Sequence, residues 1–433
     1  MMHRFHLTVD GPPKTIEHSD NADRTFYWHD ASTHPWFRAN VGPLLGALGC
    51  AEPRNIDLVR IAAAVLAADR SASRSGTLSR WNQRELELTV DVTDAEPWTA
   101  HSEGFEALLG FLTGDTWRLH FRSRIGVPEP TAVVGLDASR VVLLSGGADS
   151  ASGALLSGLE LAATGHHQVL VSHWSSPNLA PLQRVVAAEI ERLAPGTTTE
   201  HLQIHLARGR QSPTGKGYGK EDSTRSRSLL FIALGLAVAS AQQLPLWLPE
   251  NGYASINPPL SRSRRGSLST KTTHPKFLED LTALLKGVGA HGAIVNPYAW
   301  STKGEMFEAV RDRTDRDTAG RFLSATSSCS HTGTRSWGLP PHTACGECFG
   351  CVLRKASFHA AKLEDTTPYF TPATDRQAAW LQEKSVVPAM RDFLREPFGQ
   401  NDLARLRIPA GLALADVDAL CQRGRAELAE TML

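Results

Sequence analysis

The chain has 433 residues, of which 41% are hydrophobic and 21% charged, a balance that excludes a disordered or fibrous protein. Its 45 basic and 45 acidic side chains cancel, so no overall charge draws it to nucleic acid or to a membrane surface. The longest apolar run, 229–239, is far shorter than the roughly 20 residues of a membrane span, and the N-terminus lacks the apolar segment of a signal peptide. We therefore expect a cytoplasmic protein of two or three units, with no membrane partner and with nucleic acid as a disfavoured one.

The first 135 residues are expected to form an N-terminal α+β domain of unknown function. Apolar residues at helical spacing predict a helix over 57–69. Short runs with strand-like composition predict strands over 3–9, 24–28, 85–92 and 116–122. This domain shows no catalytic constellation, and the prolines and glycine of 128–138 indicate a linker to the next unit.

Residues 136–325 show short apolar strands in alternation with helices, which predicts an α/β domain with a doubly wound parallel sheet. Helices are predicted from residue 150 onward, over 182–193 and over 228–241. Strands are predicted over 141–144, 168–171, 201–206 and 246–248. Ligands of such sheets bind at the carboxyl ends of the strands, so a site is expected in the segments that follow them.

Two long basic connections follow strands of this sheet, at 208–227 and 262–276. Connections of this length inside a compact domain are usually functional loops or disordered segments. A solvated charged loop explains each of them equally well. Two of them on one sheet favour the binding of anions.

The sequence SGGADS, residues 145–150, directly follows the first of these strands. Gly146 and Gly147 permit left-handed backbone angles and carry no side chain, so backbone N–H groups can converge on an anion where the next helix starts. The lysine of the common phosphate-binding loop and the third glycine of the dinucleotide fingerprint are missing. An ordinary strand-to-helix turn explains Gly146 but not the whole sequence, and Asp149 is suited to Mg²⁺ bound together with phosphates.

Four of the six cysteines cluster in the segment 326–370. They are Cys329, Cys345, Cys348 and Cys351, and the last three form a C-x2-C-x2-C sequence. Four thiolates suit a tetrahedral Zn²⁺ with no position left for water, which predicts a structural metal site. An iron–sulfur cluster is the alternative, because the same spacing serves ferredoxins.

The last segment, 371–433, is expected to form a C-terminal helical region. Amphipathic patterns predict two helices, over 374–394 and 412–431. Helices of this kind favour a role in packing or assembly over a role in a site.

The turn at 145–150 resembles the pyrophosphate loop, or PP-loop, of the ATP pyrophosphatase superfamily. The resemblance implies an adenine nucleotide alpha hydrolase-like fold that binds ATP with Mg²⁺. It also implies transfer of AMP to a carbonyl or carboxylate oxygen with release of pyrophosphate. The residues that it assigns to ATP are Ser145, Gly146, Gly147, Asp149, Ser150, Ser172 and His173.

With the four cysteines added, residues 140–370 resemble the 7-cyano-7-deazaguanine synthase (QueC) family. The sequence CGECFGCVLRKASFHAAKLEDTTPY, 345–369, is similar to the C-terminal signature of that family. NPYAWSTKGEMF, 296–307, is similar to its lysine segment, and RSLLFIALGLAVA, 227–239, to the start of one of its helices. The catalytic residues that the resemblance implies are Ser145, Asp149, Ser150, Lys303 and Arg227.

Family members make a nitrile from 7-carboxy-7-deazaguanine, ammonia and ATP through an amide. This chain has PENGYASINPPLSRSRRG at 249–266, where the family has Tyr-Pro-Asp-Cys-Arg. The altered segment and the added N-terminal domain resemble the defence-associated QueC-like proteins of the Qat and type IV CBASS antiphage systems. The resemblance then implies a substrate pocket with Glu250, Asn251 and Asn257, although a turn-rich loop explains these residues equally well.

Three functions follow from these observations. The first is an ATP-dependent enzyme of antiphage defence that adenylates a carboxylate of the 7-carboxy-7-deazaguanine type, for amide formation with ammonia or with an amine of a partner protein. The second is a housekeeping nitrile synthase of queuosine precursor formation. The third is an ATP-binding scaffold subunit without turnover, which would act through its partners.

Overall fold

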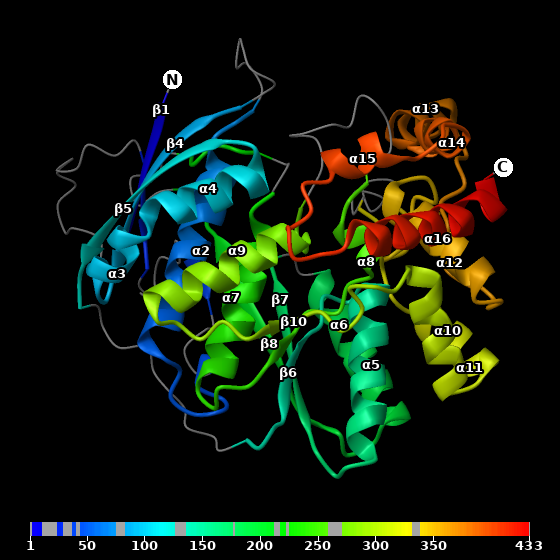
Figure 1. The fold of residues 1–433 in the computed structure, drawn as a ribbon, viewed down its shortest axis with the longest axis horizontal. Coiled ribbons are helices and arrows are strands. Elements are labelled where there is room, and N and C mark those ends of the chain that lie inside the picture. Colours follow the sequence, from blue (N-terminus) through cyan, green and yellow to red (C-terminus); the bar gives the residue numbers. More distant parts are fainter. Residues whose placement is uncertain are drawn as a thin grey trace.

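The computed structural model describes residues 2–10, 24–28, 37–39, 44–74, 83–125, 136–175, 178–211, 217–221, 225–258, 271–330 and 338–432. Most of the predicted linker at 128–138 lies outside these residues, as do parts of both basic connections, at 212–216, 222–224 and 259–270. The described chain forms two sheets with helices around them, and the C-terminal helices gather at one end (Figure 1).

The larger sheet has six strands in the order β10-β9-β6-β7-β8-β3. From β10 to β8 the neighbouring strands are parallel, and the edge strand β3 is antiparallel to β8. The bounds are β6 Arg140–Leu143, β7 Gln168–Trp174, β8 Thr198–Arg208, β9 Leu246–Trp247, β10 Ile294–Val295 and β3 Phe37–Ala39. The predicted strands of residues 136–325 are present, whereas β3 and β10 were not predicted.

Helices cover both faces of this sheet, as the alternation of buried side chains on β6 shows. Val142 and Leu144 pack with α5 and α6, whereas Val141 and Leu143 pack with α7 and α9. The sheet is therefore doubly wound, and the order of its strands reverses between β6 and β9. The helices are α5 Ala148–Ala162, α6 Leu179–Leu193, α7 Arg227–Ser240, α9 Pro275–Val288 and α10 Lys303–Arg313.

The smaller sheet has four strands in the order β2-β1-β4-β5, and all of them run parallel. The α+β expectation for this region is therefore wrong, because the described strands are all parallel, with α2 before β4 and with α3 and α4 between β4 and β5. The four strands were predicted, but the composition of a strand does not determine the direction of its pairing. The bounds are β1 Met2–Thr8, β2 Arg24–Tyr27, β4 Glu85–Val92, β5 Thr116–Ser123, α2 Pro53–Ser71, α3 Ala95–Ala100 and α4 Ser102–Thr113.

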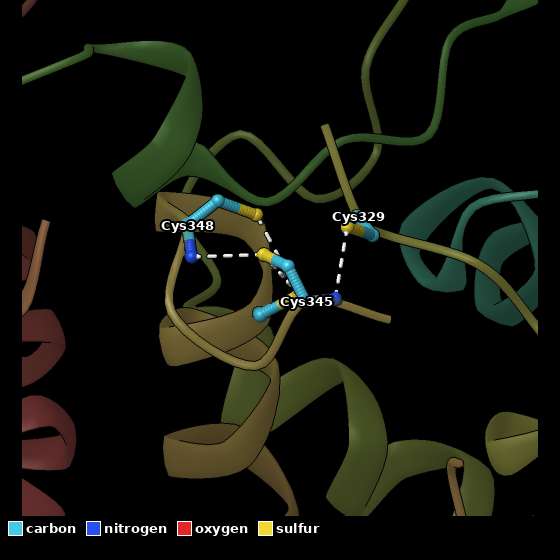
Figure 2. Close-up of side chains that lie close together, drawn as sticks. Cys329, Cys345 and Cys348 are labelled. Atoms are coloured by element: carbon cyan, nitrogen blue, oxygen red, sulfur yellow. Dashed lines mark hydrogen bonds between the residues drawn. The ribbon is translucent and has the colours of Figure 1, made fainter. Parts of the chain in front are cut away.

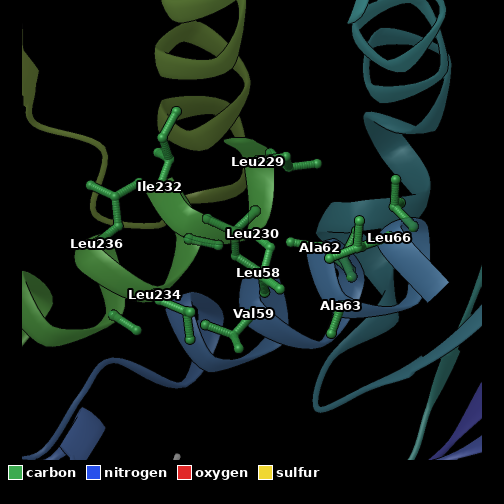
Figure 3. Close-up of a cluster of buried hydrophobic side chains, with 14 of the residues drawn as sticks. Leu58, Val59, Ala62, Ala63, Leu66, Leu229, Leu230, Ile232, Leu234 and Leu236 are labelled. Carbon is green, nitrogen blue, oxygen red and sulfur yellow. The ribbon is translucent and has the colours of Figure 1, made fainter. Parts of the chain in front are cut away.

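The two sheets share one hydrophobic cluster through helices α2 and α7, which pack against each other. Figure 3 shows the contact, with Leu58, Val59 and Ala62 of α2 close to Leu230 and Leu234 of α7. Burial of each leucine in such a contact contributes roughly 1.5–3 kcal/mol relative to an exposed side chain. The N-terminal region is thus joined to the larger sheet by a continuous apolar core.

The C-terminal region contains more helices than the sequence predicted. The expected helix over 374–394 is two helices, because the chain breaks at Ser385 and Val386 before Pro388, which has no N–H with which to continue a helix. None of the helices within the described residues has the length and apolar character to cross a membrane. The C-terminal helices are α13 Asp375–Lys384, α14 Val387–Arg395, α15 Gln400–Arg405 and α16 Leu414–Met432. The remaining helices of the chain are α8 Gly252–Ser255, α11 Arg316–Ser324 and α12 Phe349–Ala360.

Candidate functional site

A cavity of about 490 Å³ lies at the carboxyl ends of β6, β7 and β9, where the order of strands reverses. The turn after β6, the segment after β9 and the chain around Cys329 form its polar walls. Leu143, Phe231 and Leu248 contribute apolar surface. Open α/β sheets bind their ligands at this position, so the cavity is the candidate functional site.

The turn at 145–150 is held in shape by its own hydrogen bonds. The Ser145 hydroxyl lies 2.9 Å from the Ser150 hydroxyl, which donates to the carbonyl of Gly147 at 3.0 Å. The N–H of Gly147 donates to Ser145 Oγ at 3.2 Å. Gly146 has a φ of +88°, and a Cβ there would lie 3.3 Å from Leu182, so this position requires glycine.

Helix α5 begins directly after Gly147, so the positive end of its dipole faces the cavity from behind the turn. The Gly146 carbonyl accepts from the N–H of Ser327 at 3.0 Å, which joins the turn to the segment that carries Cys329. A preorganised turn at the N-terminus of a long helix favours the binding of an anion.

Asp149 lies in the first turn of α5 and meets residues from two distant segments. Its Oδ2 contacts the Nζ of Lys303, and its Oδ1 accepts from the side-chain amide of Asn251 at 3.1 Å. The same amide lies 3.5 Å from the carboxyl group of Glu250. Of the three residues around Asp149, Asn251 is completely buried and Lys303 is 4% exposed, so this charge cluster is largely shielded from solvent.

Glu250 lines the cavity beside Asp149. Burial, and then the negative charge of Asp149, raise the pKa of Glu250 well above its ordinary value, against the opposing charge of Lys303. A bound cation or an additional donor would stabilise the ionised form of this carboxyl group. The pair of carboxylates therefore provides oxygen ligands of the kind that Mg²⁺ prefers.

Local hydrogen bonds bring the segments of Asn251 and Lys303 together. The N–H of Gly252 donates to the carbonyls of Tyr298 and Ser301 at 3.0 and 2.8 Å. Asn251 caps α8 by accepting from the N–H of Ala254 at 2.8 Å. Lys303 is the first residue of α10, which begins with a capping box between Thr302 and Glu305.

His173 lines the cavity near the end of β7. One ring nitrogen, Nε2, lies 2.8 Å from the carbonyl of Leu206, and the other, Nδ1, is buried without a hydrogen-bond partner. Burial, together with the nearby charge of Arg227, lowers the pKa of His173 to about 4, so the ring is neutral at pH 7. The neutral ring therefore has Nδ1 left to accept a hydrogen bond.

Not all of the other predicted residues lie at the cavity. Arg227, the first residue of α7, lines it with an exposed side chain. Ser172 is completely buried, and its hydroxyl contacts the carbonyl of Leu144 at 2.5 Å and the ring of His201 at 2.8 Å. Asn257 follows α8 with a φ of +50°. Several predicted residues are not among the described residues that line the cavity, namely Gly146, Asp149, Ser172, Asn251, Asn257 and Lys303.

The four cysteines lie together beside the cavity, at the start of α12, and Figure 2 shows three of them. Their sulfurs are all within 4.8 Å of one another, with 3.5 Å between Cys348 and Cys351 and 3.8 Å between Cys345 and Cys351. Four sulfurs at about 2.3 Å from a tetrahedral zinc ion would lie about 3.8 Å apart. The cysteines could therefore hold a single metal ion such as zinc.

Backbone N–H groups also point at these sulfurs. Cys345 donates to Cys329 Sγ, and Cys348 to Cys345 Sγ, both at 3.3 Å. Such bonds favour the thiolate form that binds metal. Because Cys329 and the segment 341–343 line the cavity, the metal site forms part of its wall.

The segment that follows the cysteines supports the same wall of the cavity. Arg354 is 1% exposed and donates to the Thr326 hydroxyl at 2.8 Å and to the carbonyl of Leu323 at 2.6 Å. The Tyr369 hydroxyl donates to Asp365 at 2.5 Å. These side chains hold α12 against the segment that leads to Cys329.

Several residues of the cavity could not be recognised from the sequence alone. Phe231 and the pair Thr272 and Thr273 line it, as do residues 327–330. The capping box of Thr302 and Glu305 was visible as T-x-x-E and would have placed Lys303 at the start of a helix. The wall residues 327–330 are small and polar and give no comparable sequence signal.

Comparison of the sequence with models of known protein families and with curated proteins finds no match.

Proposed function

We propose that this protein is an ATP-dependent enzyme that adenylates a carboxylate, releases pyrophosphate and passes the activated acyl group to an amine. The observation that carries the proposal is the cluster of Asp149, Asn251 and Lys303 at the helix-capping turn 145–150, beside the cavity. The site combines positive charge, a helix N-terminus and a pair of carboxylates. This combination suits a nucleoside triphosphate with its metal ion.

The proposed reaction has two steps. A carboxylate oxygen of the substrate attacks the α-phosphorus of ATP, and the bond from that phosphorus to the bridging oxygen breaks, so that pyrophosphate leaves. The nitrogen of an amine then attacks the acyl carbon of the adenylate, loses a proton and displaces AMP. The products are an amide, AMP and pyrophosphate.

The residues of the site would act mainly through position and charge. The N–H groups at the start of α5 and the ammonium group of Lys303 would stabilise the charge that develops on the departing pyrophosphate. Asp149 and Glu250 would hold Mg²⁺, which supplies charge neutralisation between the phosphates when it is bound. Ser145 and Ser150 would keep the turn in its binding shape.

The substrate is proposed to be an acid of the 7-carboxy-7-deazaguanine type, and the setting to be antiphage defence. A planar heterocycle suits the apolar surface of Phe231, and Arg227 is placed to bind a carboxylate or phosphate. The acceptor amine is ammonia or belongs to a partner protein of the same defence system. The four cysteines would bind Zn²⁺ to shape the wall of the cavity, with no catalytic position open.

The test is incubation of the purified protein with ATP, Mg²⁺ and 7-carboxy-7-deazaguanine, with pyrophosphate and AMP measured and the products identified by mass spectrometry. Lys303→Met keeps the length of the side chain without its charge and is expected to slow pyrophosphate release by about a hundredfold. Lys362→Met, at an exposed lysine after α12, is the matched control.

The outcome also separates the proposed function from its alternatives. A nitrile formed with ammonia alone would favour the housekeeping synthase. ATP binding without release of pyrophosphate, with or without partner proteins, would contradict the enzyme and favour the scaffold.

A further inference from the structure

The C-terminal helix α16 contacts the segment that carries Lys303. The Thr302 hydroxyl donates to Oε1 of Glu427, and the N–H of Gly304 donates to Oε2 of the same carboxylate at 3.2 Å. One carboxylate of α16 therefore binds the residues on both sides of Lys303. The sequence indicated a role in packing or assembly for this helix.

A second residue of α16 binds the same segment. The Nε of Arg423 donates to Glu305 at 2.7 Å, and its Nη2 donates to the carbonyl of Trp300 at 2.7 Å. Arg423 and Glu427 are four residues apart and share one face of the helix. Together they hold residues 300–305 from α16.

Glycines allow close contact between these elements. A Cβ at Gly424 would lie 2.4 Å from the ring of Tyr253, which follows the segment of Glu250 and Asn251. A Cβ at Gly304 would lie 2.5 Å from the carboxylate of Glu427. Helix α16 thus rests directly on both segments of the site, and a small displacement of the helix would be transmitted to them.

The surroundings of Glu427 disfavour its ionised form. Burial raises the pKa of Glu427 to about 7, and the nearby carboxylates of Glu305 and Glu308 add to this effect. The bonds from Thr302 and Gly304 oppose it. Arg423, the other charged group of α16 at this contact, is paired with Glu305. A carboxyl group whose ionisation is made unfavourable by folding reduces stability where it is charged.

We propose that Glu427 is a positioning residue that, from α16, holds Lys303 against Asp149. The inference rests on the proposed function in one respect, namely that Lys303 acts in the reaction. Its physical basis is that Glu427 binds the residue before and the residue after Lys303. An error of about 1 Å in the position of a reacting group can reduce the rate by about a hundredfold.

The first experiment compares full-length Glu427→Ala, Glu427→Gln and Glu430→Ala with the wild type, with kcat and KM for ATP measured from pyrophosphate release. We expect Glu427→Ala to lower kcat by about tenfold or more with little change in KM. Glu427→Gln offers an acceptor to Gly304 and a donor to Thr302, so it should restore most of the rate. Glu430, three residues on and largely exposed, is the matched control and should leave the rate unchanged.

A second readout needs no turnover. Acylation of Lys303 by an amine-reactive reagent, followed by peptide mass spectrometry, reports whether this buried lysine keeps its contact. We expect faster labelling in Glu427→Ala than in the wild type or Glu430→Ala, with thermal melting used to verify that each variant is folded. If labelling follows this pattern and no carboxylate supports pyrophosphate release, the positioning role stands and the proposed function fails.

Two results would overturn the inference. One is unchanged labelling of Lys303 in folded Glu427→Ala together with a wild-type kcat. The other is a loss of rate in Glu427→Gln as large as that in Glu427→Ala, because the hydrogen bonds would then not be what holds Lys303.

Discussion

Each of the two sheets carries a buried cluster of carboxylates and cations, and the two clusters differ in how many hydrogen bonds their carboxylates accept. At the amino ends of β4 and β5, both oxygens of Asp115 accept from Arg74 and Arg84 at 2.7 to 3.2 Å. Asp69 accepts from the same two arginines, and also from Ser226 at 2.8 Å. Although burial would raise the pKa of Asp115, its bonds to Arg84 and Arg74 hold that pKa below the usual range.

The cluster at the cavity has the opposite character. Glu250 receives a long hydrogen bond of 3.5 Å from Asn251, and burial and Asp149 raise its pKa. Both clusters are built from acids and bases, but bonds from two arginines lower the pKa of Asp115, whereas burial and Asp149 raise the pKa of Glu250. The comparison teaches that a buried carboxyl group whose ionised form is disfavoured, more than the presence of buried charge, indicates a functional site.

The comparison predicts that a substitution in the cluster of Asp115 reduces the stability of the fold more than a substitution at the cavity does. Asp115→Ala leaves two buried guanidinium groups short of a partner and should reduce the free energy of unfolding by about 3–5 kcal/mol. Urea denaturation followed by circular dichroism measures the effect. Glu200→Ala, at an exposed position of β8, is the control and should stay within about 0.5 kcal/mol of the wild type. A loss below 1 kcal/mol for Asp115→Ala would mean that this network is not structural.

Changes in the cluster at the cavity should affect activity more than folding. Asp149→Asn keeps the shape of the side chain and removes a charge that disfavours ionised Glu250. We expect pyrophosphate release to fall by about 10²–10³-fold, with a smaller loss in melting temperature than that of Asp115→Ala, because the charge of Glu250 also acts on Lys303. Glu160→Gln, at the other end of α5, is the control. A melting temperature lowered as far as that of Asp115→Ala would remove the distinction between the two clusters.

Glu427 lies between the two cases, because it is bonded twice and still has a raised pKa of about 7. The unfolded chain ionises this group near 4.5, so folding becomes less favourable as the pH rises from 4.5 through 7, and the full cost is present above pH 7. Glu427→Gln should therefore stabilise the protein at pH 8, by at most about 3 kcal/mol, and much less at pH 4.5. Calorimetry at the two values of pH measures the difference, and an equal effect at both would contradict it.

The elements of the larger sheet could be predicted because their local patterns are strong. Val141 to Leu144 form a continuous apolar run that ends at two glycines, and α7 is apolar over most of its length. The strands β3 and β10 were missed, because they are short, with three and two residues, and lie outside the apolar runs from which the other strands were predicted. The parallel pairing in the smaller sheet could not be predicted either, because the sequence of one strand does not determine which strand it pairs with or in which direction.

The individual motifs of the site could be predicted from the sequence, but the contacts between them could not. The turn at 145–150 and the spacing of the cysteines carry their own chemistry, and the structure places the four sulfurs together. Lys303 and Asp149 are 154 residues apart, so only a family resemblance could relate them before the structure. Glu427 looks like an ordinary polar position of an amphipathic helix, and its contact with Thr302 arises only from the packing of α16.

The antiparallel strand β3 has a consequence for the behaviour of the protein at high concentration. The outer strand of a sheet exposes a row of backbone N–H and C=O groups that can pair with another chain. Residues 37–39 pair with residues 206–208 at the end of β8, and the opposite edge is β10, which is only two residues long. The N-terminal part of the chain thus covers this end of the edge strand, and its removal would leave the backbone groups of 206–208 open to pairing with another chain.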